Sequence, residues 1–347
     1  MQYTDPSREV VKALMNYGPR YSKISKETGV PVTTVRYILR EKLPRLGFIV
    51  RAAINYGLLG LQRYLVLIET SLPLEYMCSL LDLLGERAYL NYYTYLMKER
   101  KFLTIFSIPP SFQDSFINFL DRLIDLKLLR RYTINKLEYR RLIPFRTNCF
   151  DFNRGVWSLN WDEHKSEEIH EIYEIPTGFE NLTSLDLKIL AKLNENAFVK
   201  YTELANYLNV TRQTIKRHYE KIKKTIYMYG LLWIPKENPE LVSVPLIVGS
   251  SFDEISRKTM LNIPFSHLEM KTDDRKYYVM LFIPSLGFYK TVRYMNERMN
   301  IELFDFLSMK HTANFLCDGL PYNDNKGWIN VFDLITEKIL EKVRLFK

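Results

Sequence analysis

Cysteines, glycines and long apolar segments are scarce in this chain, and each scarcity excludes a class of protein. The 347 residues include 3 cysteines and 13 glycines. Cys78, Cys149 and Cys317 stand far apart in the sequence, which argues against a disulfide framework and a structural zinc site. With 47% apolar residues and few glycines, long disordered tracts are not expected. The most apolar runs, such as Tyr64–Ile68, have the length of a strand rather than of a membrane span.

Signals for targeting and for catalysis are also missing. The first ten residues are polar and charged rather than a signal peptide. We find no Ser/His/Asp set, no paired acids, no glycine-rich phosphate loop and no metal-ligand spacing. We therefore expect a cytoplasmic protein that is not an enzyme. We expect no catalytic residue, no metal, no cofactor and no membrane contact.

The net charge of +9 is concentrated in two segments. Residues 1–60 contain ten Lys and Arg against four Asp and Glu, and residues 181–236 again contain ten against four. The rest of the chain holds 29 basic against 32 acidic residues. Positive charge confined to two segments indicates two places where a polyanion binds.

Three sequence blocks recur in the same order. Residues 24–36 align with residues 204–216, residues 101–110 with 276–285, and residues 153–157 with 325–328, at shifts of 180, 175 and 172 positions. Because the order is kept and the shift is nearly constant, we interpret the chain as an internal duplication.

Each repeat begins with three helical segments. They are predicted near residues 7–17, 21–28 and 32–42 in the first repeat, and near 184–194, 202–208 and 212–224 in the second. A short helix, a tight turn and a helix with basic outer residues are typical of a helix-turn-helix. A Gly turn and a strand follow at residues 46–49 and 230–234, and we expect each to form a wing.

The outward residues of the two third helices are the predicted DNA-contacting residues. Arginine and lysine contact guanine or phosphate, glutamine reads adenine, and threonine contacts thymine methyl groups. Because the two sets differ, two unlike half-sites are expected. The predicted set is Thr33, Thr34, Arg36, Tyr37, Arg40 and Arg45 in the first repeat, and Arg212, Gln213, Thr214, Lys216, Arg217, Lys221 and Lys224 in the second.

After each expected wing the hydrophobic period changes to the order βαββαβ. In the first repeat the elements are predicted near residues 64–70, 74–84, 89–97, 102–108, 111–126 and 129–137, and in the second near 244–250, 252–261, 265–271, 277–283, 286–300 and 301–309. The fold class is therefore α+β, with two tandem copies of a winged helix-turn-helix and a ferredoxin-like domain. The predicted domains are 1–60, 61–160 with a tail, an acidic linker at 161–182, 183–240, and 241–347 with a C-terminal tail.

On these elements the chain resembles the Lrp/AsnC, or feast/famine, transcriptional regulators of bacteria and archaea. The resemblance rests on residues 24–36, on Leu46–Ile49 and on the matching second copy, and it covers roughly residues 7–137 and 183–309. It implies an archaeal, sequence-specific regulator that binds double-stranded DNA as a single-chain pseudo-dimer. It also implies a small-molecule effector and a homodimer formed through the ferredoxin-like sheets. Residues 98–101 and 273–276 depart from the family's Gly/Asp-rich effector motif.

Two other functions remain open. Siroheme decarboxylases resemble Lrp-type proteins in architecture, and they imply histidines and arginines near the sheet acting on a tetrapyrrole. Of the five histidines, His164, His170, His218, His267 and His311, only His267 lies near a comparable strand. The aromatic strands Tyr89–Tyr95 and Tyr277–Phe282 suggest a single-stranded nucleic-acid binder, although the glycines of the RNA-binding signature are missing.

The tails contain a motif of their own. Asn153–Trp157 and Asn325–Trp328 each place a turn before a tryptophan. Either each tryptophan covers its own sheet, or each tail docks across the molecule and holds the two halves together.

Overall fold

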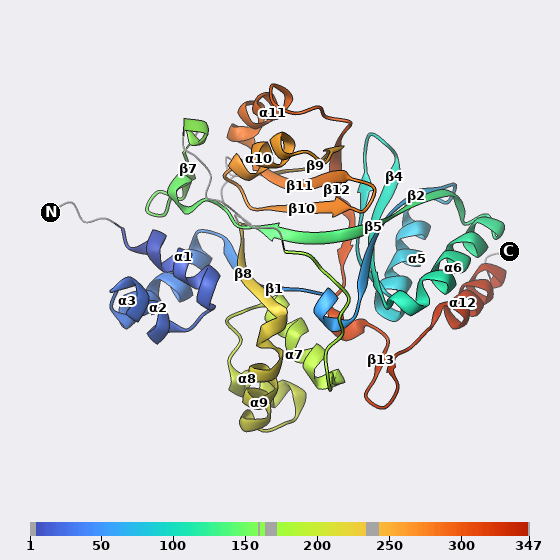
Figure 1. Ribbon diagram of the computed structural model, residues 1–347, viewed down its shortest axis with the longest axis horizontal. Helices are drawn as coiled ribbons and strands as arrows, with labels where there is room; N and C mark the ends of the chain where they lie inside the picture. Colours follow the sequence, from blue (N-terminus) through green and yellow to red (C-terminus); the bar gives the residue numbers. More distant parts are fainter. Residues whose placement is uncertain (1–4, 159, 164–171, 234–242, 346–347) are drawn as a thin grey trace.

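A ring of eight antiparallel strands lies at the centre of the molecule, with two helical units beside one of its ends (Figure 1). The structure is a computed structural model, and it describes residues 5–158, 160–163, 172–233 and 243–345. The expected α+β class is confirmed in its coarse form, as a large antiparallel sheet with packed helices. Within the described residues, no helix is long and apolar enough to cross a membrane.

The helical units have the predicted elements. The first contains α1 (Ser7–Tyr17), α2 (Tyr21–Thr28) and α3 (Val32–Tyr37), extended by a π-helical turn η1 (Ile38–Lys42) and by α4 (Leu43–Arg45), and the second contains α7 (Ser184–Glu195), α8 (Tyr201–Leu208) and α9 (Arg212–Ile222). In each unit the turn before the third helix needs one left-handed residue, Gly29 with φ 71° and Asn209 with φ 52°. Glycine and asparagine are the residues that adopt this conformation at least cost.

The ring combines strands from both parts of the chain. Its order is β10 (His267–Thr272), β11 (Lys276–Pro284), β9 (Ser243–Ser251), β12 (Leu303–Asn314), β3 (Leu90–Leu96), β4 (Lys101–Ile108), β2 (Gln62–Thr70) and β5 (Leu129–Ile143). Helices α5 (Leu74–Arg87), α6 (Gln113–Asp125), α10 (Glu254–Asn262) and α11 (Phe288–Asn296) lie outside the strands (Figure 1). The two βαββαβ orders were predicted, but the pairing of β5 with β10 and of β12 with β3 was not.

Alternation along the strands separates two cores. Leu65 on β2 points into the ring, where it packs with Ile105, Met270 and Met280. The neighbouring residue Tyr64 points outward into the core under the helices. Because successive side chains point to opposite faces, alternate residues of each strand fill the inside of the ring and the others pack under the helices.

The prediction of two wings is wrong. The strands expected to form them, β1 (Phe48–Ile54) and β8 (Ile226–Trp233), pair with each other, with Phe48 opposite Trp233 and Ile54 opposite Ile226. They form one two-stranded ribbon between the helical units and the ring (Figure 1). The backbone groups that a wing presents to DNA are therefore used inside the protein. Ile234, at the end of the second predicted wing, lies outside the described residues.

Both tryptophan tails form small hairpins that contact the other half of the chain. The first consists of β6 (Phe150–Asp151) and β7 (Val156–Trp157), and the second of β13 (Tyr322–Asn323) and β14 (Gly327–Trp328). The ring centroids of Trp157 and Phe265 lie 4.9 Å apart. Trp328 Nε1 donates a hydrogen bond to the Leu59 carbonyl at 3.0 Å. These are the contacts expected of tails that dock across the molecule.

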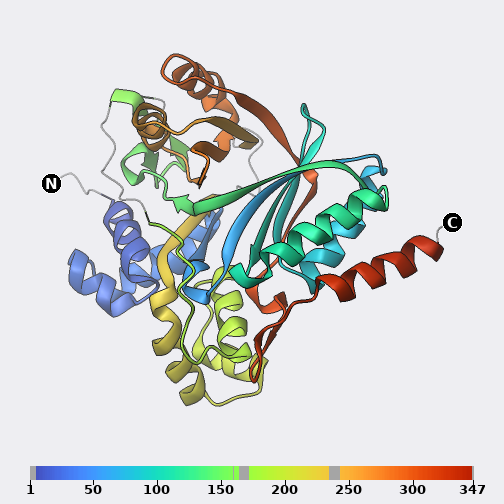
Figure 2. The same ribbon diagram turned by 45° about the vertical axis from the view of Figure 1, so that its right-hand side comes forward.

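The chain ends in a helix that the sequence analysis did not predict, α12 (Phe332–Leu345), which runs beside α6 (Figure 2). Phe332 is buried and packs against Phe116 and Phe119 of α6 at 5.4 and 5.5 Å. The end of the second half therefore packs against a helix of the first half. Residues 164–171 of the acidic linker, which include His164 and His170, lie outside the described residues.

Gly85 on α5 tests how closely the two halves pack. A Cβ atom at this position would lie 2.2 Å from Cε2 of Phe315, which follows β12. Helix propensity alone favours Gly85→Ala by about 1 kcal/mol, but overpacking typically costs about 1–3 kcal/mol. We expect Gly85→Ala to lower the free energy of unfolding, measured in urea.

Gly319→Ala is the matched control, because its added Cβ would lie at an ordinary 3.6 Å from the Gly85 carbonyl oxygen. Its stability should stay within about 0.5 kcal/mol of the unsubstituted protein. A gain in stability in Gly85→Ala would contradict the close packing between α5 and the segment after β12.

Candidate functional site: an arginine-lined cavity

The ribbon of β1 and β8 covers one end of the ring and lines a partly open cavity of about 120 Å³. Its walls come from both ribbon strands and from β2, β3, β5, β10 and the end of β12. Three arginines line it: Arg51 from β1, Arg63 from β2 and Arg140 from β5. We call these three residues the arginine cluster. A cavity that collects cationic side chains from three strands is a candidate anion-binding site.

Strand geometry explains why these arginines point inward. Arg63 is two residues before Leu65, which packs inside the ring, so both side chains leave β2 on the same face. On β5 the register shifts beside Glu138, since Lys271 pairs with Tyr139 whereas Thr272 pairs with Leu137. The one-residue bulge places Arg140, rather than Tyr139, on the inner face with Leu137.

The charges of the cluster are only partly compensated. The Nε atom of Arg63 lies 3.2 Å from Oε2 of Glu174, and both side chains are 4% exposed. The guanidinium of Arg63 also lies over the Tyr56 ring, 4.1 Å from its centroid. Burial, with the like charge of Arg63 as the next contribution, lowers the pKa of Arg140 to about 10. Burial lowers the pKa of Arg51 as well.

Several polar atoms at the cavity have no hydrogen-bond partner among the described residues. They are Nε of Arg51, Nε of Arg140, and both side-chain polar atoms of Asn91 on β3. An unsatisfied buried donor costs about 1–3 kcal/mol, and more when it is charged. Most buried polar groups in native proteins have a partner, so exceptions that face one cavity indicate a ligand or water position.

Tyr227 on β8 adds a hydroxyl group to the cavity wall. It accepts a hydrogen bond from the Leu142 backbone amide at 3.0 Å. Its own proton is therefore available to a group in the cavity. Burial raises the pKa of Tyr227, so it keeps this proton at neutral pH.

The opposite face of β5 carries a different polar cluster. Glu269 on β10 is fully buried, and its carboxylate lies 3.2 Å from Nε of Arg141 and 3.4 Å from Nη2 of Arg257. It also accepts a hydrogen bond from the Tyr277 hydroxyl at 2.8 Å. The shared anion is surrounded by donors, and the cluster is a structural one.

His267, the histidine selected from the sequence, belongs to this outer face and not to the cavity. It lies two residues before Glu269 on β10, and Nδ1 is 3.0 Å from the Phe265 carbonyl oxygen. Burial lowers its pKa, so the ring is neutral. No group of three or more His, Cys, Asp or Glu side chains within the described residues could hold a metal ion.

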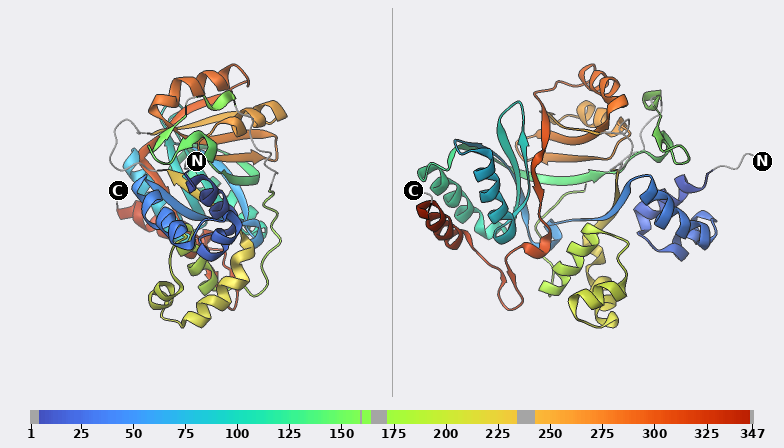
Figure 3. Two further views of the ribbon diagram at one scale, coloured as in Figure 1. Left: turned by 90° about the vertical axis from the view of Figure 1, so that its left-hand side faces the viewer. Right: turned by 180° about the vertical axis from the view of Figure 1, so that it is seen from behind.

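The residues predicted to contact DNA lie on the surface of the helical units (Figure 3). Ten are exposed: Thr33, Arg36, Tyr37, Arg40, Arg45, Arg212, Gln213, Lys216, Arg217 and Lys224. Three are half-buried: Thr34, Thr214 and Lys221. The structure does not bring them to the arginine cluster, and it does not test whether they contact DNA.

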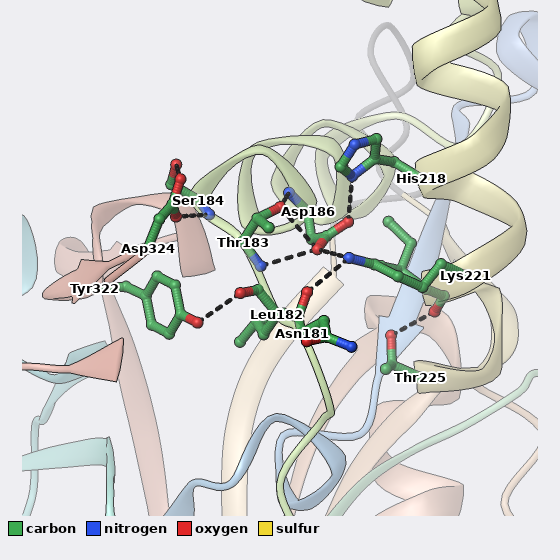
Figure 4. Close-up of polar contacts among 11 residues, drawn as sticks. Asn181, Leu182, Thr183, Ser184, Asp186, His218, Lys221, Thr225, Tyr322 and Asp324 are labelled. Carbon is green, nitrogen blue, oxygen red and sulfur yellow. Dashed lines mark hydrogen bonds and ion pairs between the residues drawn. The ribbon is translucent and has the colours of Figure 1, made fainter. Parts of the chain in front are cut away.

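Some of these residues have partners within the protein. Arg40 donates to the Tyr21 hydroxyl at 2.6 Å and to the Phe198 carbonyl at 3.0 Å, which joins the two helical units. Lys221 forms an ion pair with the buried carboxylate of Asp186 (Figure 4). The second tail reaches the same end of α7, where Asp324 accepts from the Ser184 amide at 2.6 Å. This part of the second helical unit is an internal contact region.

The aromatic strands do not form an open platform for nucleic-acid bases. Tyr89 and Tyr277 are fully buried, and Tyr93 is 3% exposed. The hydroxyl of Tyr93 donates to Asp82 on α5 at 2.8 Å. Helices cover the outer face of the strands and the ring encloses the inner face, so the interpretation as a single-stranded nucleic-acid binder is not supported.

Comparison with known proteins identifies the fold. No protein-family model matches the chain, and no curated protein matches its sequence. A crystal structure of the siroheme decarboxylase NirDL matches 98% of this chain and 100% of its own, with a TM-score of 0.51 and 8% identity. A second crystal structure, of NirDL with an iron-uroporphyrin III analogue, matches 99% of this chain and 100% of its own, with a TM-score of 0.49 and 8% identity.

This comparison corrects the functional predictions. Over nearly the whole chain, the fold that suggested an archaeal Lrp/AsnC-like regulator of transcription is also the fold of a decarboxylase. The prediction of a DNA-binding pseudo-dimer that is not an enzyme was therefore wrong. The physical reason lies in the ribbon, because the strands assigned as wings line a cavity.

Sequence reasoning missed all three arginines of the cluster. Arg51 and Arg63 stand in the apolar stretches Phe48–Ile54 and Gln62–Ile68, at positions where a buried strand normally has an apolar residue. Each was a usable signal, because a cation in a buried strand is rare unless it is paired or functional. Their convergence could not be seen, since it depends on pairings between distant strands.

We expect Arg140→Met to stabilise the protein in the absence of ligand. The substitution removes a cation that burial and Arg63 disfavour, while Arg63 keeps its ion pair with Glu174. Replacing poorly compensated buried charge with an apolar side chain of similar size raises stability by about 1–4 kcal/mol. Urea unfolding monitored by tryptophan fluorescence measures the gain.

Arg131→Met is the control, because Arg131 lies on the same strand but is exposed. Its free energy of unfolding should change by less than about 0.5 kcal/mol. A loss of stability in Arg140→Met would mean that the charge of Arg140 is well compensated, contrary to the interpretation of the site.

Proposed function

We propose that this chain is an enzyme that binds an anionic tetrapyrrole through its carboxylate groups and removes carboxyl groups from it, as the name of NirDL says of siroheme. The observation that carries the proposal is the arginine cluster, in which buried donors of Arg51 and Arg140 face one cavity without a partner among the described residues. The fold shared with NirDL supports the same reading.

The chemistry of the cluster fits carboxylate groups. Guanidinium is planar, keeps its charge and offers donors in a fork that matches the two oxygens of a carboxylate. One carboxylate, that of Glu174, already lies beside Arg63. Three arginines against one glutamate leave two positive charges, and a molecule with several carboxylates on its rim would neutralise them.

The size of the cavity defines which part of the ligand enters it. Pockets that hold a whole small molecule usually measure about 300–1,000 Å³, whereas this cavity measures about 120 Å³. It has room for a carboxylate-bearing substituent and not for a tetrapyrrole ring. We infer that the tetrapyrrole ring binds only after part of the cavity wall has moved.

Decarboxylation requires a bond to break and a proton to be delivered. The carbon–carbon bond to the carboxylate breaks, carbon dioxide leaves, and a proton takes its place on the ligand carbon. The proposed role of the arginine cluster is to hold neighbouring carboxylates so that the reacting one is fixed in place. The hydroxyl of Tyr227, which keeps its proton at neutral pH, is placed to deliver it.

We also infer that the chain consists of two tandem copies of a helix-turn-helix unit followed by a ferredoxin-like unit. The support is the matching order β2-α5-β3-β4-α6-β5 and β9-α10-β10-β11-α11-β12, together with the three aligned sequence blocks. Under this alignment Leu231, Pro245 and Thr312 correspond to Arg51, Arg63 and Arg140. The duplicated chain therefore has one arginine cluster and not two.

The test is binding and turnover of siroheme by the purified protein. Tetrapyrrole binding changes the visible absorption spectrum, and mass spectrometry of the product detects each carboxyl group lost. Arg51→Met and Arg140→Met should each weaken binding by about 10–100-fold, because a hydrogen bond to a charged group contributes about 1.5–3 kcal/mol. Arg131→Met should bind as the unsubstituted protein does.

Two results would overturn the proposal. One is the absence of any spectral change when siroheme is added to the unsubstituted protein. The other is equal affinity in the unsubstituted protein, Arg51→Met and Arg140→Met, which would place the ligand away from the cluster. Because Arg140→Met is expected to be more stable, weaker binding by this variant could not be attributed to unfolding.

A further inference from the structure

Residues 173–177 run as an extended segment between β5 and the turn after β1, next to Arg63, and we call them the strap. The backbone amide of Glu174 donates to the Glu138 carbonyl at 3.0 Å, and that of Thr177 donates to the Gly57 carbonyl at 3.1 Å. Tyr173 packs edge-on against the Tyr139 ring at 5.7 Å. The strap is therefore fixed at both ends, on β5 and on the turn after β1.

The strap directs its one carboxylate into the arginine cluster. Glu174 is 5% exposed, and Oε2 lies 3.2 Å from Nε of Arg63. Oε1 accepts a weak hydrogen bond from the Tyr56 amide at 3.4 Å. Glu174 thus occupies the position that the carboxylate of a bound anion would take beside Arg63.

The carboxylate of Glu174 is held by Arg63 and by backbone hydrogen bonds from Tyr56 and Arg140, but its burial disfavours the charged form. Burial raises its pKa although Arg63 and Arg140 act in the opposite direction. One carboxylate beside three cations is a poorer partner than a ligand that brings several carboxylates. If ligand carboxylates replace that of Glu174, Arg63 stays paired and the free donors of Arg51 and Arg140 gain acceptors as well.

Gly57 allows the strap to lie close to the turn after β1. A Cβ atom at this position would lie 2.6 Å from the backbone carbon of Glu174 and 2.6 Å from the carbonyl oxygen of Ile175. Both are backbone atoms, so they cannot turn aside as the end of a side chain can. An alanine here would have to push the strap off the site.

We propose that the strap is a built-in competitor: the carboxylate of Glu174 substitutes for a ligand carboxylate in the arginine cluster and must leave before a polycarboxylate tetrapyrrole binds. This inference rests on the proposed function and adds its regulation. The small cavity is then the closed form of the site, and the larger site opens when the strap leaves. The apparent Kd then equals the Kd of the open form divided by the fraction of molecules in which the strap is open.

The experiment compares iron uroporphyrin binding in four proteins by absorption titration. Glu174→Gln removes the competing charge, and Gly57→Ala displaces the strap without touching an arginine. We expect each to bind about tenfold or more tightly than the unsubstituted protein, as removal of a closed state predicts. Glu180→Gln is the matched control, since Glu180 is an exposed carboxylate a few residues further along, and its affinity should be unchanged.

Hydrogen exchange supplies a second readout that does not depend on the variants. In the unsubstituted protein, saturating iron uroporphyrin should speed exchange in a peptide covering residues 173–177, because the Glu174 and Thr177 amides lose their acceptors. Peptides from β2 and β4 should exchange as before. A structural role of Glu174 alone would leave the strap protected when the ligand binds.

The outcomes separate this inference from the proposed function. If the unsubstituted protein binds but Glu174→Gln and Gly57→Ala bind no more tightly and the strap stays protected, the strap is not a competitor and the proposed function stands. If the unsubstituted protein binds and the two variants bind at least tenfold more tightly, both ideas are supported. If none of the four proteins binds, the proposed function fails and the inference fails with it.

Discussion

Three guanidinium groups held around one small cavity are the constraint on which the rest of this structure depends. Each cation loses hydration when it is buried, and each repels the others, so the arrangement persists only because the surrounding strands enforce it. The β5 bulge turns Arg140 inward, β2 presents Arg63, and the ribbon holds Arg51 over them. A fold optimised for stability alone would have apolar residues at these positions, which is why the cluster indicates function.

Other contacts have to offset the stability that the cluster costs, and the contacts between the two halves of the chain can do so. Each tail hairpin packs its tryptophan on the opposite half of the chain. Phe332 of α12 packs against Phe119 of α6. The ring itself closes only through pairing of β5 with β10 and β12 with β3. The cavity therefore lies where both halves meet, and its walls cannot separate without breaking these contacts.

Local pattern was enough to predict most elements, and not enough to predict how they pair. Hydrophobic period and turn residues gave α1 and α2 to the residue and the order of the βαββαβ elements, because these depend on neighbours close in sequence. The predicted ends of β5 and β12 were six and five residues too early, so Arg140 lay outside the predicted strand. A Gly turn followed by a strand looks the same whether it becomes a wing or a ribbon. Only the pairing of Phe48 with Trp233, 185 positions away, distinguishes the two. The site was missed for a related reason, since the pairing of β2 with β5 brings Arg140 near Arg63, and Arg51 joins them only through the ribbon.

The asymmetry between the halves bears on how such a site arises. If the halves descend from one unit, an unspecialised pair would carry equivalent residues at both ends of the ring. Here the positions that correspond to the arginines are Leu231, Pro245 and Thr312. Leu231 is fully buried, so an arginine there would add a second uncompensated charge. Under the proposed duplication, joining two units in one chain permits one half to supply the cations and the other to supply the packing that holds them, a division that two identical subunits cannot make.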